Sequence, residues 1–358
     1  MAETFALDSL VVPGTYVQVR AEALIGGAAV STGNIGVVGT AGTVPARTEL
    51  LSGYAEAVAA FGAYDKFAAG AGTLNLTRAV EIAYRNGAGV VFAHALAAGA
   101  DSADFTAGFE AVIKDDVNIL IAPELSTADA ISVLAPIVEE AENNNKDLIA
   151  VIGSDADPVA DIKAQVTDND RIIFCAPGIE TFDSAEKDLV TLPGTYAAAA
   201  VAGLISSLSV QTSPTNKVIP AVTKLSQRFT YGEEVDLLKS RVLVLEERGG
   251  VRVVRGLTTD SGPFKEITTR RITDFAKGGI RQVAAPFIGR LNNQRVRKAL
   301  NGAINGFLTG MVADEALVAY DLSVTATRQD EIAGRALVNV LMQPTFSITF
   351  IPVTLTLS

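Results

Sequence analysis

Apolar positions over residues 88–208 gather into short continuous runs, and the segments between these runs have the apolar spacing of helices. Runs that are apolar at every position are typical of strands buried on both faces of a parallel sheet. Strands that alternate with helices indicate βαβ units. We therefore predict an open, mainly parallel α/β sheet, with strands at 89–96, 118–122, 148–153 and 171–176 and helices at 102–114, 127–144 (kinked or broken near Pro136), 158–166 and 193–208.

The pattern changes after residue 210. Two apolar runs flank the turn Arg248-Gly249-Gly250 and predict a hairpin of 242–246 and 251–254. Further along, we predict helices at 267–278 and 293–310 and a strand at 321–325, followed by a final apolar stretch at 337–342 before Pro344. The second of these helices is expected to bury one face, made of Val296, Leu300, Ile304 and Phe307 with Leu308 at its flank. This part of the chain is therefore expected to be a mixed α/β domain.

The last thirteen residues, 346–358, alternate between apolar and polar positions and contain no Lys, Arg, Asp or Glu. The apolar members are Phe346, Ile348, Phe350, Val353, Leu355 and Leu357. Period-two alternation predicts a strand with one buried face. A long uncharged strand at a free edge favours aggregation unless something always pairs with it. Either it is an interior strand of its own fold, or it enters the sheet of another molecule.

The N-terminal part carries a second short strand pattern. A turn at Pro13-Gly14 precedes a predicted strand in which Tyr16 and Gln18 lie opposite Val17 and Val19. We also predict a strand at 34–40 and helices at 52–61 and 75–86, the last ending at Asn86-Gly87.

The composition changes this picture in one respect. The 358 residues suffice for two or three domains, and 49% of them are hydrophobic, with a mean hydropathy of +0.32. No run reaches the roughly 18 apolar residues that a membrane span needs, and the N-terminus has no secretory signal pattern, so we expect no membrane insertion. Such an apolar chain either hides surface in an oligomer or has a large Ala-rich core.

Charge is distributed unevenly along the chain. Residues 1–220 hold 11 Lys and Arg against 27 Asp and Glu, a net −16, whereas residues 221–358 hold 18 against 13, a net +5. The richest basic stretch is 265–298. A polarised molecule of this kind suits head-to-tail contacts or an acidic partner. The overall charge of −11 argues against a dedicated nucleic-acid binder.

The residues that usually carry chemistry are scarce. The single histidine, His94, lies in an apolar strand, and the single cysteine, Cys175, lies in another. They are too far apart in sequence for the usual His/Cys metal cage, and no nucleophile elbow or phosphate-binding glycine loop occurs. We therefore predict no catalytic, cofactor or metal site. An α/β enzyme of another type, or a soluble oligomeric ligand-binding module, stays open as the alternative.

Several segments in their order and spacing resemble the contractile tail sheath family of phage tails, bacteriocin-like particles and extracellular injection systems. They are Pro13-Gly14-Thr15-Tyr16-Val17, 33–41, 51–54 with Phe61-Gly62, 76–87, 255–259, 264–271, 307–310 and 344–348. The chain departs from many relatives at Phe264, where a tryptophan is expected. It also lacks large inserted outer domains, which implies a compact sheath subunit.

The resemblance implies a structural protein, not an enzyme, that needs no cofactor. Its copies would form a helical homo-oligomer of stacked hexameric rings around an inner tube, in contact with baseplate and tail terminator proteins. Its terminal strands would be exchanged between neighbours, and the polymer would contract from a metastable extended state. The particle would be assembled in the bacterial cytoplasm as a virion tail or a released contractile particle.

The resemblance also assigns roles to parts of the chain. It implies an N-terminal arm (1–20), an N-terminal part of the core (21–87), an outward-facing α/β region (88–210), a tube-facing C-terminal domain (211–345) and a C-terminal arm (346–358). The inter-subunit strand residues are expected to be Tyr16, Val17, Val19 and the six apolar residues of 346–358. Arg295, Arg297 and Lys298 are expected to contact the inner tube.

Overall fold

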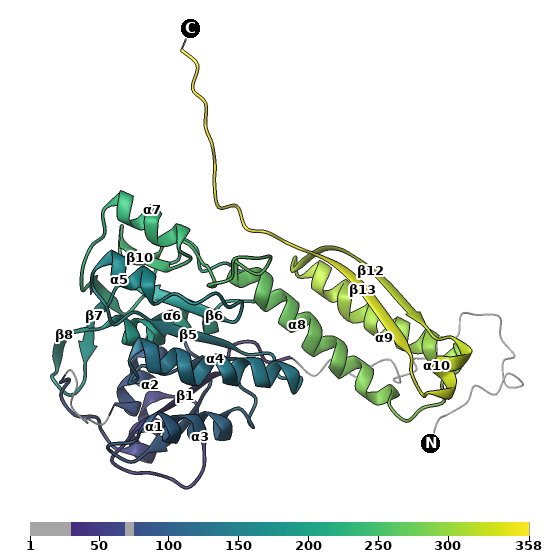
Figure 1. The fold of residues 1–358 in the computed structure, drawn as a ribbon, viewed down its shortest axis with the longest axis horizontal. Helices are drawn as coiled ribbons and strands as arrows, with labels where there is room; N and C mark the ends of the chain where they lie inside the picture. Colours follow the sequence, from purple (N-terminus) through teal and green to yellow (C-terminus); the bar gives the residue numbers. More distant parts are fainter. Residues whose placement is uncertain (1–29, 69–74, 358) are drawn as a thin grey trace, which may run out of the picture.

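A computed structural model of the chain describes residues 30–68 and 75–357. Figure 1 shows a large α/β part and an elongated C-terminal part, which is built on two long helices and projects to one side. The final residues leave the C-terminal part as an extended segment that points away from the rest of the described chain (Figure 1).

The α/β part is built on an eight-stranded sheet with the order β11-β10-β6-β5-β4-β1-β3-β2. Its parallel strands are β1 (Ile35–Thr40), β3 (Val91–Leu96), β4 (Ile119–Ile121), β5 (Ile149–Gly153), β6 (Ile172–Ala176) and β10 (Leu243–Glu247). The edge strands β2 (Glu49–Leu51) and β11 (Val251–Val253) are antiparallel to their neighbours. The predicted open, mainly parallel sheet is thus confirmed, and it also takes strands from outside 88–208.

Helices cover both faces of this sheet because its strands are apolar on both sides. On one face lie α1 (Tyr54–Phe61), α2 (Leu76–Arg85) and α6 (Gly194–Ser207). On the other lie α3 (Ser102–Val112), α4 (Thr127–Asn143), α5 (Val159–Ala164) and α7 (Tyr231–Lys239). Along β1, Val37 packs into the first layer and Val38 into the second, as the period of a strand requires.

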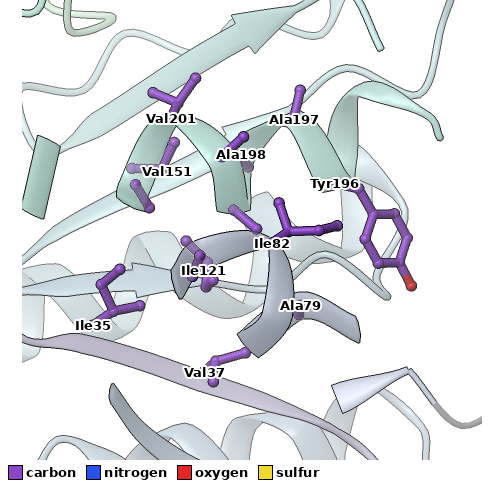
Figure 2. Packing of buried hydrophobic residues seen from close by; sticks show 14 of the residues in the cluster. Ile35, Val37, Ala79, Ile82, Ile121, Val151, Tyr196, Ala197, Ala198 and Val201 are labelled. Atoms are coloured by element: carbon purple, nitrogen blue, oxygen red, sulfur yellow. The ribbon is translucent and has the colours of Figure 1, made fainter. Parts of the chain in front are cut away.

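Small residues let α6 lie very close to the sheet and to α2. A Cβ at Gly153 would lie 1.7 Å from the carbonyl oxygen of Gly194, and one at Gly203 would lie 2.4 Å from that of Ala83. Figure 2 shows Ala197, Ala198 and Val201 of α6 among side chains of the strands and of α2. The Ala-rich composition of this helix therefore belongs to a thin, densely packed layer.

A three-stranded antiparallel sheet, with the order β8-β7-β9, flanks the main sheet. It consists of β7 (Ile179–Asp183), β8 (Asp188–Leu192) and β9 (Val222–Leu225). The sequence pattern did not predict this sheet. Its strands are short, and β8 is mostly exposed, so the pattern carries little signal.

The C-terminal part consists of two long helices and a two-stranded antiparallel sheet. Its elements are α8 (Ile267–Ala284), η3 (Ala285–Phe287), α9 (Gln294–Ala313), β12 (Leu317–Thr325), α10 (Arg328–Ile332) and β13 (Leu337–Pro344). These elements share a core separate from that of the α/β part. The predicted hairpin of 242–246 and 251–254 is confirmed as β10 and β11, which belong to the large sheet.

Two details of the predicted helices are corrected. The helix over 127–144 is continuous, although Pro136 lies inside it. Pro136 lies on the exposed side of α4, where the carbonyl that it leaves without a helical donor can reach water. In α9 the buried face is Leu300, Ile304, Leu308 and Met311. Phe307, which was predicted for that face, lies at its flank against Phe275.

Candidate functional site

His94 and Cys175, the residues first considered for chemistry, both lie on strands of the large sheet. His94 lies on β3, its Nδ1 is 3.4 Å from the Thr48 hydroxyl, and burial lowers the pKa of the imidazole. Cys175 is buried in β6, which raises the pKa of its thiol to about 12. Among residues 30–68 and 75–357, no group of three or more His, Cys, Asp or Glu side chains could hold a metal ion. No helix in these ranges is long and apolar enough to cross a membrane.

The C-terminal segment 346–357 has no strand partner within the described chain. Its apolar side chains are among the most exposed in the structure, from 67% for Phe346 to 97% for Leu357. The segment is attached through the Thr345 amide, which donates to the Ala316 carbonyl at 3.1 Å. Further along, the Arg255 guanidinium lies 5.5 Å from the centre of the Phe350 ring. The predicted arm is therefore extended and available, and its role as a strand stays a prediction.

The sheet of β12 and β13 lies beside the start of this arm. Its inner face packs on α8 and α9 through Leu322, Val324, Val338, Val340 and Met342. Its outer face exposes Val318 and Leu341. Within residues 30–68 and 75–357, each of the two strands pairs along one edge, and its other edge has no strand partner. Two-stranded sheets are marginal alone, so this one is stabilised by the helices beneath it and has room for added strands.

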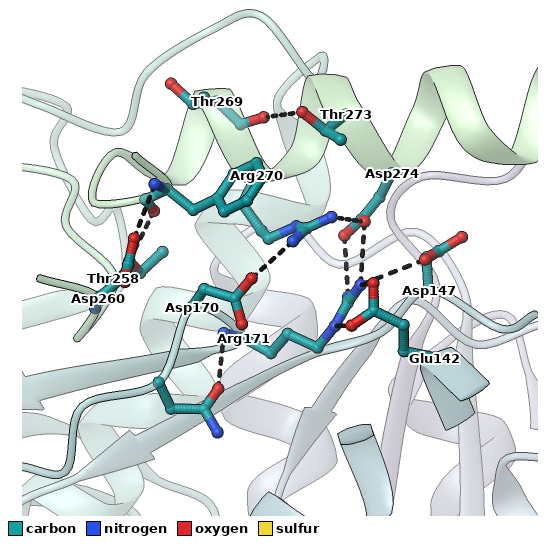
Figure 3. Close-up of polar contacts among 12 residues, drawn as sticks. Glu142, Asp147, Asp170, Arg171, Thr258, Asp260, Thr269, Arg270, Thr273 and Asp274 are labelled. Carbon is teal, nitrogen blue, oxygen red and sulfur yellow. Dashed lines mark hydrogen bonds and ion pairs between the residues drawn. The ribbon is translucent and has the colours of Figure 1, made fainter. Parts of the chain in front are cut away.

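A network of ion pairs joins the C-terminal part to the α/β part. Arg171, at the start of β6, is buried and pairs with Glu142, Asp147 and Asp274 at 2.7, 3.2 and 3.2 Å. Figure 3 shows Arg171 beneath α8, with Arg270 and Asp274 reaching down from the helix. Arg270 pairs with Asp170 at 2.7 Å and with Asp274 at 2.5 Å.

The same network continues along one stripe of α8. Lys277 pairs with Glu142 and Asp147 at 2.6 Å, and Arg281 also pairs with Asp147. Hydrogen bonds from Arg171 hold the pKa of the Glu142 carboxyl far below its usual range. The polar face of α8 is thus used inside the molecule, while its apolar face builds the C-terminal core.

A further contact fixes the beginning of α8. Arg271 is almost fully buried, and its guanidinium donates to the carbonyls of Leu208, Ser209 and Thr32 at 2.9, 3.3 and 3.1 Å. The first two carbonyls follow the end of α6, where a cation interacts favourably with the helix dipole. Desolvation lowers the pKa of this guanidinium to about 10, so it stays charged at neutral pH.

Phe264, where the sequence resemblance leads one to expect tryptophan, stacks on Arg270. The guanidinium carbon is 4.2 Å from the ring centre. A cation–π contact of this kind holds Arg270 in place for Asp170 and Asp274. The smaller ring therefore still supports the interdomain network.

The three basic residues predicted to contact a tube lie near the start of α9. Arg295 and Lys298 are exposed. Arg297 is largely covered and pairs with Glu331 of α10 at 3.0 Å, and it donates to the Asn292 side chain at 2.9 Å. Among the residues that the structure describes, Arg295 and Lys298 have no ion-pair partner, whereas Arg297 is engaged within the subunit. Tyr16, Val17 and Val19 lie outside the described residues.

Sequence reasoning missed the interdomain network. Half of this network could have been predicted from the sequence. Arg270, Asp274, Lys277 and Arg281 recur at the spacing of one helix face. The other half comes from the start of two strands and the end of α4. Nothing in the local sequence says that Arg171 would be buried rather than solvated.

Comparison with known proteins agrees with this architecture. The family model of the phage tail sheath protein central domain matches residues 98–259, and that of the phage tail sheath C-terminal domain matches residues 259–358. No curated protein matches the chain by sequence.

Solved sheath structures share the fold. A chain in the anti-feeding prophage (AFP) baseplate has a TM-score of 0.77 and 18% identity, covering 97% of this chain and 99% of that one. The AFP helical sheath in its contracted state has a TM-score of 0.73 and 19% sequence identity. The match covers 96% of this chain and 99% of that one. A sheath tail protein of Listeria innocua has a TM-score of 0.69 and 12% sequence identity. The match covers 89% of this chain and 93% of that one. Together the two domain models span 98–358, and the chain belongs to the phage tail sheath protein family.

Proposed function

We propose that this chain is the structural subunit of a contractile sheath that polymerises helically around an inner tube. It would contract from a metastable extended state and drive the tube through a target envelope. The observation that carries the proposal is the exposed, uncharged segment 346–357 beside a two-stranded sheet whose outer edges have no strand partner in the described part of the chain. Family membership and the similarity to a helical sheath in its contracted state support the same function.

The arm and the sheet are complementary in chemistry and length. At roughly 3.3 Å per residue, residues 346–357 span about 40 Å, enough to run the length of either β12 or β13. Main-chain hydrogen bonds would pair the arm with an open edge of a neighbour's sheet. Pro352, which lacks an amide donor, suits an edge strand. Tyr16, Val17 and Val19 of the N-terminal arm would enter a neighbour's sheet in the same way.

Such an exchange is heterologous, because each copy donates at one place and accepts at another. Heterologous contacts that do not close on themselves build helical filaments. We infer that the copies stack as hexameric rings linked by the exchanged strands. The baseplate complex in which a similar AFP chain occurs supports baseplate proteins as further partners, and we propose tail terminator proteins as well. Assembly would take place in the bacterial cytoplasm.

Contraction in this scheme needs no cofactor. The work would come from subunit interfaces that become more complementary in the contracted lattice, while the exchanged arms keep neighbours connected. Residues 88–210 would face outward, and residues 211–345 would face the tube. Arg295, Arg297 and Lys298 are proposed as tube contacts. Arg295 and Lys298 are free for this role, whereas Arg297 would act from within its pair with Glu331.

Deletion of 346–358 tests the proposal. Within the described chain this segment contributes only the Arg255–Phe350 contact and local hydrogen bonding, so the truncated subunit should keep the thermal stability of the full chain. The full chain should form hollow cylinders in negative-stain electron microscopy, and the truncation should remain as discrete particles. Cylinders formed normally by the truncated protein would refute strand exchange through this arm.

A further inference from the structure

A cavity lies between the α/β part and α8, the helix that joins it to the C-terminal part (Figure 1). Its volume is about 350 Å³, the space of roughly a dozen waters. One wall is formed by the segments that lead into β4 and β5, and the other by one side of α8. Apolar residues in these walls are Val117, Ile119, Ile149, Val210, Phe275 and Gly278. Such walls favour apolar contents over water.

Most charged side chains at this cavity already have partners. Asp147 and Asp274 belong to the ion-pair network around Arg171. The Arg271 guanidinium donates to three main-chain carbonyls, and the Lys146 ammonium donates to two others. An uncharged occupant therefore fits the cavity better than a charged ligand, which would have to break these contacts.

The residues that open the described chain lie in the wall of the cavity. Val30 lies against α8, because a Cβ at Gly278 would be 3.2 Å from its Cγ1. The Ser31 hydroxyl donates to the Asn118 side chain at 2.8 Å, and Asn118 donates back to the Ser31 carbonyl at 3.0 Å. The Thr32 carbonyl accepts from the buried guanidinium on α8 at 3.1 Å. Since residues 30–32 are held at both walls, the chain before them must start beside the cavity.

The sequence before Val30 has matching chemistry. Residues 23–29 read Ala-Leu-Ile-Gly-Gly-Ala-Ala and contain no charged residue. Their two large side chains are Ile25 and Leu24, five and six positions before Val30. That distance along the chain is at most about 20 Å. The pair Gly26-Gly27 permits a tight turn, which could return both side chains to the cavity.

We propose that residues 23–29 of the same chain bind in this cavity, with Leu24 and Ile25 as the side chains that fill it. Removing two aliphatic side chains from water would stabilise the junction of the two parts. The contact would also anchor the N-terminal arm at this junction, so that a neighbour bound to residues 1–20 would pull on both parts together. The inference goes beyond the proposed function and does not depend on polymerisation, because the contact lies within one subunit.

A tryptophan reporter tests whether this segment is shielded from water. The chain contains no tryptophan, so one introduced tryptophan reports on its own surroundings. The full chain with Leu24→Trp is compared with Tyr231→Trp, a position at the start of α7 that is 82% exposed. We expect the emission of Leu24→Trp to be blue-shifted, and acrylamide to quench it severalfold less than that of Tyr231→Trp. Equal quenching of the two variants would overturn the inference.

Crosslinking separates the chain's own segment from that of a neighbour. Ile25→Cys is combined with Lys114→Cys at the cavity, or with Lys239→Cys at the end of α7 as the matched control. Both lysines are exposed, and burial of Cys175 raises the pKa of its thiol, so that residue stays unreactive. With a short bifunctional maleimide, the Lys114→Cys pair should crosslink within one chain and the control pair should not, as measured by denaturing electrophoresis and peptide mass spectrometry.

The remaining outcomes are decisive as well. Crosslinks between two chains would make a neighbour's segment the occupant and would overturn the inference. No crosslink in the Lys114→Cys pair, or equal internal crosslinking in the control, would overturn it too. If the parent forms no cylinders, the proposed function fails, but both measurements can still be made on the subunit. The two failures are therefore distinct.

Discussion

Arg171 and Asp274 face each other across the junction of the two parts, with Nη1–Oδ2 and Nη2–Oδ1 separations of 3.2 and 3.3 Å. Arg171 directly precedes β6 of the parallel sheet, and Asp274 lies on α8. The paired geometry of a guanidinium and a carboxylate fixes direction as well as distance. Because Arg270, which stacks on Phe264, also pairs with Asp274, the two parts are joined by a directional polar contact.

Replacing Arg171 with alanine should strongly destabilise the protein. The buried arginine is the common partner of Glu142, Asp147 and Asp274, and its loss removes one cation from each of them, including the largely buried Asp147 and Asp274. Breaking a buried ion pair in this way costs about 3–5 kcal/mol. Urea unfolding followed by circular dichroism measures the change.

Lys163→Ala provides the control for Arg171→Ala. Lys163 pairs with Asp236 at 3.2 Å on the surface, where such a pair contributes about 0–1 kcal/mol. Equal effects of the two substitutions would show that the interdomain network does not stabilise the fold.

The sequence allowed most of the sheet and most of its helices to be predicted, since the central strands β4, β5 and β6 are continuous apolar runs bounded by turns. It did not reveal which polar residues become buried. Arg171 follows Asp168, Asn169 and Asp170, a segment that locally has the composition of a surface turn. Only the packing of α8 over the start of β6 turns it into a buried side chain, and that packing depends on residues about one hundred positions away.

The same difference between local pattern and long-range packing applies to the residues at the surface. The arm was visible because alternation without charge is a local property of 346–358. The exposed Leu291 and Ile332 were not singled out, because they come from separate segments and a single exposed aliphatic residue carries no signal. Arg297 was grouped with Arg295 by composition, yet its pair with Glu331 depends on where α10 lies.

Glu124→Gln should change how stability depends on pH. The Glu124 carboxylate accepts hydrogen bonds from the Thr40 amide and hydroxyl at 2.9 and 2.8 Å, and desolvation raises its pKa from 4.5 to about 8. The folded state therefore keeps a proton that the unfolded state releases, so this group's contribution to stability is lost as the pH rises from about 4.5 to 8.

Comparing the parent protein with Glu124→Gln isolates the contribution of the Glu124 carboxyl to the pH dependence of stability. Urea unfolding at several pH values should show the parent losing on the order of 3 kcal/mol relative to Glu124→Gln between pH 5 and 8. Parallel pH curves would show that the Glu124 carboxyl titrates alike in the folded and unfolded states.

Two glycine-to-alanine substitutions on the paired helices should have opposite effects. Gly279 of α8 is buried, and a Cβ there would lie 1.9 Å from the Phe307 ring of α9, so alanine should destabilise by about 1–3 kcal/mol. Gly302 of α9 is exposed and has open space around it, so alanine should stabilise by up to about 1 kcal/mol through helix propensity. Thermal unfolding compares the two, and a destabilising Gly302→Ala would contradict the expectation.

Charge placed on alternate positions of the arm should separate the face that enters a neighbour from the face that does not. Ile348 lies on the apolar side of the alternation and Thr349 on the polar side, and both precede the break at Pro352. Side chains of a strand point alternately to its two faces. Ile348→Lys should therefore prevent cylinder formation, whereas Thr349→Lys should leave it intact, because its lysine stays in water. Negative-stain microscopy of both variants at equal concentration measures this.

Both keep the same net charge and the same folded body, so a difference between them can arise only from which face of the arm is charged. If both variants polymerise, or neither does, the arm is not bound as a strand with one buried face.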